Sequence, residues 1–446
     1  ENRSYFYPSV SGSFVFTEVM PKNDILSFGK IRASWAQVGK DASSYATNTY
    51  MWSPAAVSDG FIGIGNNWTR GNPYLKPEIQ TSWEVGAEMR FFGGRLGLDF
   101  TYYNSETTNQ IAAPRLGQST GYIFMSINSG SVSNKGMELM ITATPVETKN
   151  FSWDMTLNLS GNRGRLGEFM EGVDLFYVTD VQIGGVKAAA VPNGGYFLGI
   201  TGDYWTRETM KDADGNVVKD EKGKEVEIPN GRYIIDETTG LYKTTGVVTN
   251  VLGNREPDFI GGFNNTFTYK NLSLSVLLDI RKGGMIYNGT EYLLLSNGLS
   301  PQTLNRESVT VEGVSSVTGE PVTYTYKAGQ MYVVNGAEKS GDYMIQSYYS
   351  NYAANAYNLL TDTNWLRLRA LSLSYDFKGL FSKQSFVKGL SATVTGTNLF
   401  LWSNYKGMDP EVSVSGSGTG GSGSSGIDYC GVPATAGLSF GLNITF

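Results

Sequence analysis

The segment 211–225, KDADGNVVKDEKGKE, has the side chains whose types and spacing could hold a metal ion. Oxygen ligands at alternate positions around a glycine are typical of a calcium loop. The candidates around Gly215 are Asp212, Asp214, Asn216 and Asp220. The bidentate glutamate and full spacing of an EF-hand are missing, and Asp214-Gly215 is also a strong hairpin turn. We therefore expect a hydrophilic hairpin without a cofactor, with Ca²⁺ as the alternative.

The composition disfavours catalysis. The 446 residues include no histidine and a single cysteine, Cys430. This excludes nucleophiles that depend on histidine, metal sites with histidine ligands, and an intrachain disulfide. Paired carboxylates could hydrolyse glycosides only at a defined separation in space. A net charge of −6 also disfavours nucleic acid, which needs a basic surface. We expect no enzyme and no nucleic-acid partner.

Aromatic and polar side chains between the periodic segments could bind a ligand instead. Aromatic faces stack on sugar rings, and they suit peptides as well. The candidates for contact with a substrate or a covering partner are Tyr196, Phe197, Asp203, Tyr204, Trp205, Tyr348, Tyr349, Tyr405 and Asp409. The alternatives are packing within the loops, anchoring of a loop base, and a place at the membrane boundary.

The elements that would position these loops have a period of two. In the final segment, GLSFGLNITF, apolar residues alternate with small or polar ones: Leu438, Phe440, Leu442, Ile444 and Phe446. Alternation assigns one face of a strand to each environment. Segments 79–92 and 150–165 repeat the pattern with charged residues on the second face. The chain has no run of about 18 apolar residues, so we predict no transmembrane helix.

The pattern predicts eleven strands: 5–18, 27–38, 79–92, 95–110, 132–146, 150–165, 258–270, 271–284, 364–378, 389–402 and 433–446. Short connections alternate with five long ones: 39–78, 111–131, 166–257, 285–363 and 403–432. This is typical of an all-β, transmembrane, up-and-down antiparallel barrel with long outer loops and a periplasmic C-terminus. A soluble, secreted, glycan-binding β protein is an alternative.

The polar faces of these strands should line an aqueous lumen. The charged residues expected there are Glu84, Glu88, Arg90, Asp99, Glu138, Asp154 and Asp279. Segment 364–378 allows two interpretations. An unbroken alternation turns Arg367 and Arg369 outward, toward lipopolysaccharide phosphates, whereas a β-bulge near Ala370 turns them inward.

Several stretches resemble the SusC/RagA family of TonB-dependent outer-membrane transporters. They occur in the family's order over nearly the whole chain. They are NPYLKPEIQTSWEVGAEMRFFGGRLGLDFTYYNSETTNQI, NSGSVSNKGMELMI, REPDFIGGFNNTFTYKNLSLSVLLDIRKGGMIYN, DTNWLRLRALSLSYDF and GTNLFLWSNYKGMDPE. The chain begins at Glu1 without an initiating methionine. The resemblance therefore implies that residues 1–446 are the second half of a 22-stranded barrel, with the plug and the first half outside this sequence.

The resemblance also implies a function and partners. Family members import oligosaccharides or peptides across the outer membrane of Gram-negative bacteria. They use energy relayed by TonB through the N-terminal region, and a SusD-like surface lipoprotein acts as a lid. Of the two substrates we expect an oligosaccharide. A non-transporting structural or assembly subunit is the alternative. The terminal pattern of Phe440, Leu442, Ile444 and Phe446 resembles the signal read by barrel-assembly machinery.

Overall fold

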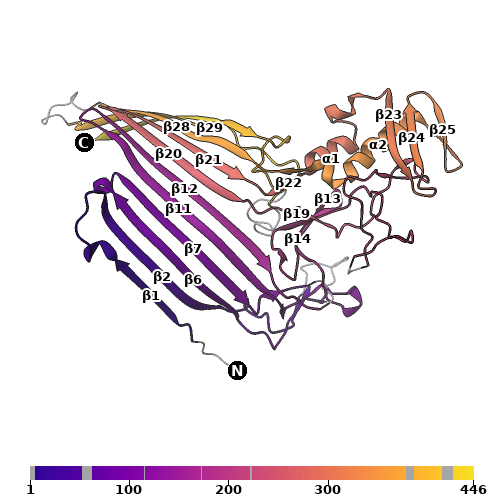
Figure 1. The fold of residues 1–446 in the computed structure, drawn as a ribbon, viewed down its shortest axis with the longest axis horizontal. Helices are drawn as coiled ribbons and strands as arrows, with labels where there is room; N and C mark the ends of the chain where they lie inside the picture. The colour runs from indigo at the N-terminus through magenta and orange to yellow at the C-terminus, as the bar shows by residue number, and fades with distance from the viewer. Residues whose placement is uncertain are drawn as a thin grey trace.

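The computed structural model describes residues 6–52, 63–114, 116–171, 173–220, 223–377, 386–413 and 425–446. Eleven strands of these residues form one large antiparallel sheet (Figure 1). In chain order they are β1 (Ser9–Val15), β2 (Leu26–Lys40), β6 (Glu78–Phe91), β7 (Leu96–Thr108), β11 (Ser131–Glu147), β12 (Phe151–Leu166), β20 (Phe259–Tyr269), β21 (Leu272–Lys282), β28 (Trp365–Asp376), β29 (Gly389–Ser403) and β31 (Gly437–Thr445). The predicted all-β fold and its eleven strands are confirmed.

The strands run up and down, because each pairs with the next of the eleven in chain order and the pairs are antiparallel. A short strand, β15 (Gly195–Tyr196), also pairs with the end of β12. Short turns lie at one rim of the sheet with the C-terminus, and the long connections lie at the other (Figure 1). The β20–β21 turn is only two residues long, and Lys270 adopts a left-handed φ of 52° there.

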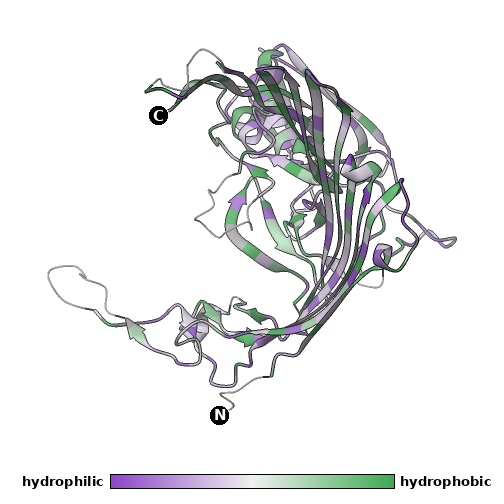
Figure 2. Cartoon of the chain, turned by 90° about the vertical axis from the view of Figure 1, so that its left-hand side faces the viewer, coloured by the Kyte–Doolittle hydropathy of each residue, from purple (hydrophilic) through white to green (hydrophobic). Residues whose placement is uncertain are grey.

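The sheet is a single curved layer that forms a trough (Figure 2). Polar side chains that share one face of the sheet line a hollow. That face is therefore the concave one. We call this face inward and the convex face outward. Outward residues include Trp83, Val85, Leu373, Phe440 and Leu442, and Phe440 and Leu442 are 75% and 73% exposed. The apolar alternation therefore does not fill a closed core.

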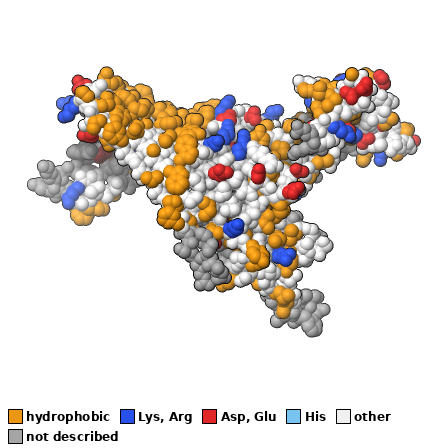
Figure 3. Space-filling model, turned by 60° about the horizontal axis from the view of Figure 1, so that its bottom comes forward, with side chains coloured by type: hydrophobic (Ala, Val, Ile, Leu, Met, Phe, Trp, Pro, Cys, Tyr) orange, Lys and Arg blue, Asp and Glu red, His pale blue; other side chains and the backbone are white. Residues whose placement is uncertain are grey.

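Exposed apolar side chains on this scale are typical of a surface that contacts lipid. Hydrophobic side chains gather at the end of the sheet that has the short turns (Figure 3). Charged side chains gather between that band and the long loops. No described helix has the length and apolar character needed to cross a membrane.

The long connections fold into a compact outer module above the sheet, which we define as residues 176–254 and 285–362 with Ile427–Asp428. Its helices are α1 (Gly289–Ser296), α2 (Gly341–Ala354) and α3 (Ala356–Leu359). Its strands are β13 (Phe176–Ile183), β14 (Val186–Ala190), β16 (Gly199–Thr201), β17 (Ile234–Asp236), β18 (Leu241–Tyr242), β19 (Val251–Asn254), β22 (Met285–Asn288), β23 (Ser308–Ser315), β24 (Pro321–Lys327), β25 (Met331–Val334), β26 (Ala337–Ser340), β27 (Leu360–Asp362) and β30 (Ile427–Asp428).

The outer module has a hydrophobic core of its own. Ile200, Ile235, Val311 and Leu295 are fully buried in it. The two longer helices begin at polar caps: Asn288 accepts the N–H of Glu291, and Ser340 accepts that of Tyr343. Shorter pairings organise the remaining loops: β3 (Met51–Trp52) with β4 (Gly65–Asn66), β5 (Thr69–Arg70) with β9 (Phe124–Met125), and β8 (Ile111–Ala112) with β10 (Ile127–Asn128).

Candidate functional site

The concave face of the sheet holds a hollow of about 830 Å³. Residues of seven strands, from β2 to β28, line it, and the loop after β29 closes its outer end. The polar groups on this wall are Arg32, Asp99, Thr101, Glu138, Asn158, Ser160, Asp279, Arg281, Arg369 and Glu411. Hydrogen-bonding groups spread over such a width suit a large polar ligand or a polar protein surface better than a small apolar molecule.

Ion pairs fix part of this wall. Arg32 reaches across β6, where Gly86 leaves room, and binds Asp99 at 2.6 Å and Thr101 Oγ1 at 2.6 Å. Nearer the short turns, Glu88 accepts Lys30 Nζ at 2.7 Å and Arg90 Nη2 at 2.9 Å. All these side chains are partly exposed, so each pair contributes little to stability and mainly sets the charge pattern of the wall.

The register places all seven predicted lumen residues on the concave face. Glu88 is opposite Asp99. Asp154, near the short turns, accepts the hydroxyl of Thr144 at 2.7 Å. Glu138 and Asp279 line the hollow itself. The contact of these residues with water in a bore remains a prediction.

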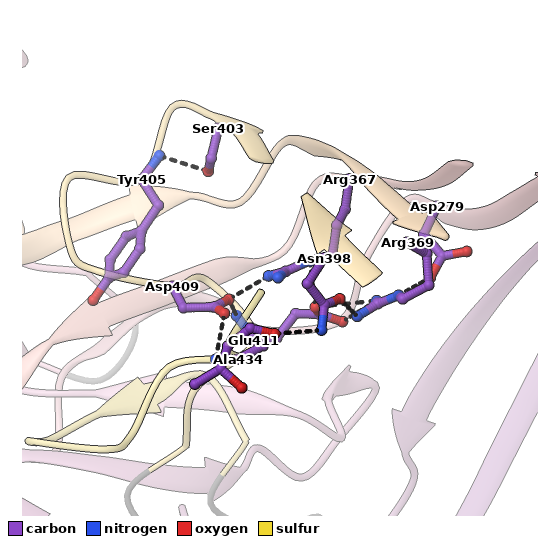
Figure 4. A network of polar contacts seen from close by, with 10 residues as sticks. Asp279, Arg367, Arg369, Asn398, Ser403, Tyr405, Asp409, Glu411 and Ala434 are labelled. Carbon is purple, nitrogen blue, oxygen red and sulfur yellow. Dashed lines mark hydrogen bonds and ion pairs between the residues drawn. The ribbon is translucent and has the colours of Figure 1, made fainter. Parts of the chain in front are cut away.

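A charged network closes the outer end of the hollow (Figure 4). We call Asp279, Arg367, Arg369, Asp409 and Glu411 the loop clasp. Arg367 Nη2 donates to Asp409 Oδ1 at 2.6 Å, and both side chains are 3% exposed. Arg367 Nε also lies 2.9 Å from Glu411 Oε2. Arg369 bridges two carboxylates: its Nε lies 2.5 Å from Asp279 Oδ2, and its Nη2 lies 2.9 Å from Glu411 Oε1.

The loop clasp holds both ends of the loop between β29 and β31. Near the start of this loop, Asp409 Oδ1 accepts the N–H of Glu411 at 3.0 Å. Near its end, Asp409 Oδ2 accepts the N–H of Ala434 at 3.1 Å, and Asn398 donates to the carbonyl of Thr435. Asp409 therefore cross-links two segments that are 25 residues apart. The Gly/Ser tract between them lies mostly outside the described residues.

The orientation of the two clasp arginines depends on a β-bulge. The pairing of β28 shifts register between Leu368 and Ala370, leaving Arg369 as the extra residue. The bulge keeps Leu371 and Leu373 outward while both arginines turn inward. Of the two interpretations of this strand, the outward one that directed Arg367 and Arg369 to lipopolysaccharide is wrong, and the bulge is correct.

A second polar cluster joins the same loop to the outer module. Tyr405 Oη donates to Asp428 Oδ2 at 2.7 Å, and Thr290 donates to Asp428 Oδ1 at 3.1 Å. Burial and the neighbouring Asp428 carboxylate raise the pKa of Tyr405. Arg255 lies beside this cluster and donates to the carbonyls of Gly199 and Ser425. Burial lowers the pKa of Arg255 to about 10.

The nine candidate contact residues have different surroundings. Trp205 is 6% exposed, stacks among Tyr233, Tyr242 and Tyr352, and donates from Nε1 to the carbonyl of Asn351. Tyr349, Tyr405 and Asp409 are also buried. Internal packing and loop anchoring, the alternatives left open by the sequence, account for the contacts of these four residues.

The other five candidates remain partly exposed. Tyr196 lies under Arg165, whose guanidinium carbon is 4.8 Å from the ring centroid. Phe197 packs on a small cluster of Val132, Leu166 and Ala190. Asp203 accepts the hydroxyl of Thr245 at 2.5 Å, and Tyr204 packs on Tyr357. Tyr348 lines a shallower cleft on the outer module with Gln302, Asn305 and Thr310.

The candidate calcium segment forms tight turns stabilised by its own carboxylates. Asp212 Oδ1 accepts the N–H groups of Asp214 and Asn216. These bonds, that from Asn216 most of all, lower the pKa of Asp212. Bridges of Lys211 with Val217 and of Lys219 with Glu225 continue the hairpin. Among the described residues, acidic and thiol side chains form no group of three or more suited to a metal ion.

The sequence interpretation missed several residues of this region. Arg32, Arg255, Arg281 and Asp428 were not chosen. Arg32 binds Asp99 within the sheet, and Arg281 donates to the carbonyl of Arg255. Arg255 and Asp428 connect the outer module with the final loop. Arg32 could have been found from strand parity, because it alternates with Ile31 and Ala33. Arg255 and Asp428 follow no local pattern, since their partners lie far away in sequence.

The comparisons with known proteins agree with this geometry. The family model described as "TonB dependent receptor-like, beta-barrel" matches residues 1–276, more than half of the chain. The chain belongs to the TonB-dependent receptor β-barrel family. Its members are outer-membrane proteins of Gram-negative bacteria, which confirms the predicted location.

Individual relatives confirm the resemblance to SusC and RagA. TonB-dependent receptor P26 of Formosa agariphila is 27% identical over 470 aligned residues, which cover 100% of this chain and 43% of the relative. TonB-dependent receptor SusC of Bacteroides thetaiotaomicron is 25% identical, with 100% and 40% covered. The chain thus spans less than half the length of the curated relatives it matches.

Solved structures share the fold. A structure titled "Structure of the RagAB peptide importer in the 'closed-closed' state" aligns with a TM-score of 0.70 and 20% identity, covering 100% of this chain and 44% of that one. The structure titled "Structure of the RagAB peptide transporter" aligns with a TM-score of 0.69 and 19% identity, with 100% and 44% covered.

Proposed function

We propose that this chain forms one wall of an outer-membrane transporter that imports a bulky polar nutrient with energy relayed by TonB. The observation that carries the proposal is the concave wall, where charged and hydrogen-bonding groups of six strands surround a hollow of about 830 Å³. Such a surface offers many weak polar contacts across its width, with the apolar side chains of Met140, Ile260 and Trp365 among them. It suits passage of a large hydrophilic molecule.

In this proposal, residues 1–446 supply about half of a 22-stranded barrel. A plug and the remaining strands of the complete protein close the bore. The outer module and the loop held by the loop clasp face a SusD-like lipoprotein lid. One relative is named SusC, and solved structures of the same fold are titled a peptide transporter and a peptide importer, so both substrate classes are to be tested. Of the two we propose an oligosaccharide, because the partly exposed tyrosines of the outer module can stack on sugar rings, and a peptide is the alternative.

The test is deletion of the complete gene, followed by growth and uptake on a panel of oligosaccharides and peptides. We expect loss of growth on one class of polymer, restored by the intact gene. A parallel strain carries the gene without its energy-coupling segment, and uptake should fail there although the barrel reaches the membrane. Unimpaired growth on every nutrient would contradict transport.

A further inference from the structure

Two cations face each other on the outward surface, near the outer ends of β11 and β12. Lys135 is directly opposite Arg163 in the register of this strand pair. The same register row continues through Asn104 to Trp83. Because residues in one row share a face, Lys135 and Arg163 point away from the hollow, to the side that carries Trp83.

The rows on either side locate this pair at a chemical boundary. One step toward the short turns, the outward row has Val85, Tyr102 and Met137. One step toward the loops, it has Thr81, Glu106, Ser133 and Arg165, whose guanidinium lies over the ring of Tyr196. The rings of Trp83 and Tyr102 pack with centroids 5.5 Å apart. Tryptophan and tyrosine prefer the level where hydrocarbon meets headgroups.

The charges of this pair are incompletely balanced. Like charges directly opposite each other destabilise a sheet. Arg163 forms an ion pair with Asp258 and donates to the carbonyl of Pro257 at 2.6 Å, and 41% of its side chain remains exposed. Lys135 is exposed. Within the described part of the chain, its ammonium group has no hydrogen bond or ion pair. The neighbouring Glu106 is opposite Ser133 in the register, and Lys135 is opposite Asn104.

Lys282 extends the patch along the sheet. Lys282 ends β21 and pairs with Phe259, and its carbonyl accepts the N–H of Asp258 at 2.7 Å. Lys282 follows Leu278 and Ile280 at alternate positions of β21, so it points outward as they do, and it is exposed. Lys135, Arg163 and Lys282 therefore share the outward face, and Arg163 forms the ion pair with Asp258. A charged side chain costs little at this depth, because its long stem lies along apolar surface while the head reaches water.

We propose that Lys135 and Arg163 bind a phosphate group of an outer-leaflet glycolipid, lipopolysaccharide. A phosphate between them would relieve the repulsion and accept charge-assisted hydrogen bonds from both side chains. Arg163 Nη1 donates to the carbonyls of Asn162 and Pro257, and Nη2 donates to Asp258, so the guanidinium would offer a phosphate its Nε–H and the second Nη2–H. Trp83 and Tyr102 would lie beside the acyl chains of the same lipid. The site is separate from Arg367 and Arg369, which point into the concave side.

The experiment uses the complete protein, stripped of lipid in detergent. The probes are bisphosphorylated lipid A and the same lipid after removal of its phosphates, added in mixed micelles and measured by native mass spectrometry. Lys135→Ala/Arg163→Ala should weaken binding of the phosphorylated lipid about tenfold or more, because two charge-assisted contacts are lost. Lys135→Ala alone, which removes no contact within the protein, should weaken it several-fold.

The controls separate this site from general charge. Lys22 and Lys149 are exposed on short connections at the other rim, and Lys22→Ala/Lys149→Ala should bind like the parent. The dephosphorylated lipid should bind all variants equally weakly. Four results would each overturn the proposal. The first is equal binding of phosphorylated lipid by the double variant and the parent, and the second is no preference of the parent for phosphate. The third is competition by inorganic phosphate as strong as that by the lipid, and the fourth is an altered oligomeric state with unchanged lipid binding.

Discussion

Buried apolar side chains gather in the outer module, whereas the sheet exposes its apolar side chains on the convex face. Ile235 and Val311 of the module are 0% exposed, and Phe440 of the sheet is 75% exposed. The module follows the rule of soluble domains, in which burial of apolar area provides stability. The sheet follows the rule of membrane barrels, in which backbone pairing is satisfied between strands and apolar residues meet lipid.

This difference explains what the sequence could and could not predict. The eleven strands were found because a period of two persists over nine or more residues in most of them. The module was missed because many of its strands are short and pair over long separations. For example, Ile234 pairs with Val314. Local patterns contain no information about such partners.

The loop clasp was predicted from the sequence only in part. The sequence indicated both arginines and Asp409 but left their orientation open, because a bulge changes the face of every later residue. Only the pairing register decides whether Arg367 meets lipid or Asp409. Arg367 and Asp409 are 42 residues apart in sequence, and the alternation along a strand does not relate positions at that separation.

The largest expected effect is at the junction of the two regions. Arg367→Ala leaves the buried Asp409 carboxylate without its cation, which typically costs about 3–5 kcal/mol. We expect loss of protection in residues 404–413 and 425–436, measured by hydrogen exchange, while β12 stays protected. Arg367→Met/Asp409→Asn, which removes both charges, should be milder. Arg232→Ala, in an exposed pair with Glu208, is the control. An equal loss of protection in the Arg367→Ala and Arg232→Ala variants would contradict a larger stabilising role of the buried Arg367–Asp409 pair.

The next effect distinguishes the two faces of one strand. Leu157 lies at the middle of β12, between Ile141 and Phe263, and points outward. Leu157→Lys should destabilise the protein by about 2–4 kcal/mol, as expected of a cation at the lipid midplane. Asn158→Lys, on the concave face, should change stability by less than about 1 kcal/mol. Urea unfolding of the complete protein in lipid vesicles measures both. A larger loss for Asn158→Lys would reverse our assignment of the faces.

The smallest effect concerns alkaline pH. Burial raises the pKa of Tyr326 to about 12, and its hydroxyl donates to the carbonyl of Gly240 at 2.9 Å. The ordinary pKa of tyrosine is about 10. The neutral phenol therefore stabilises the outer module fully below pH 10, and this contribution is lost as the pH rises toward about 12.

Phenolate absorbance and hydrogen exchange test this prediction. The module should open between these pH values while the sheet, in lipid, stays protected. Tyr326→Phe should lower module stability at neutral pH by about 1 kcal/mol and remove part of the pH dependence. Simultaneous opening of sheet and module would show that they are one cooperative unit.

The most important assignment is that the convex face of the sheet contacts lipid. The direct test is single-cysteine labelling along β12 and β31 in outer membranes, with Cys430 and any further native cysteine replaced. Cysteines at Leu157, Leu159 and Phe440 should resist a water-soluble thiol reagent and respond to a lipid-phase quencher, whereas those at Asn158, Ser160 and Ser439 should behave in the opposite way. Labelling that does not alternate, or that alternates with the reverse parity, would contradict it.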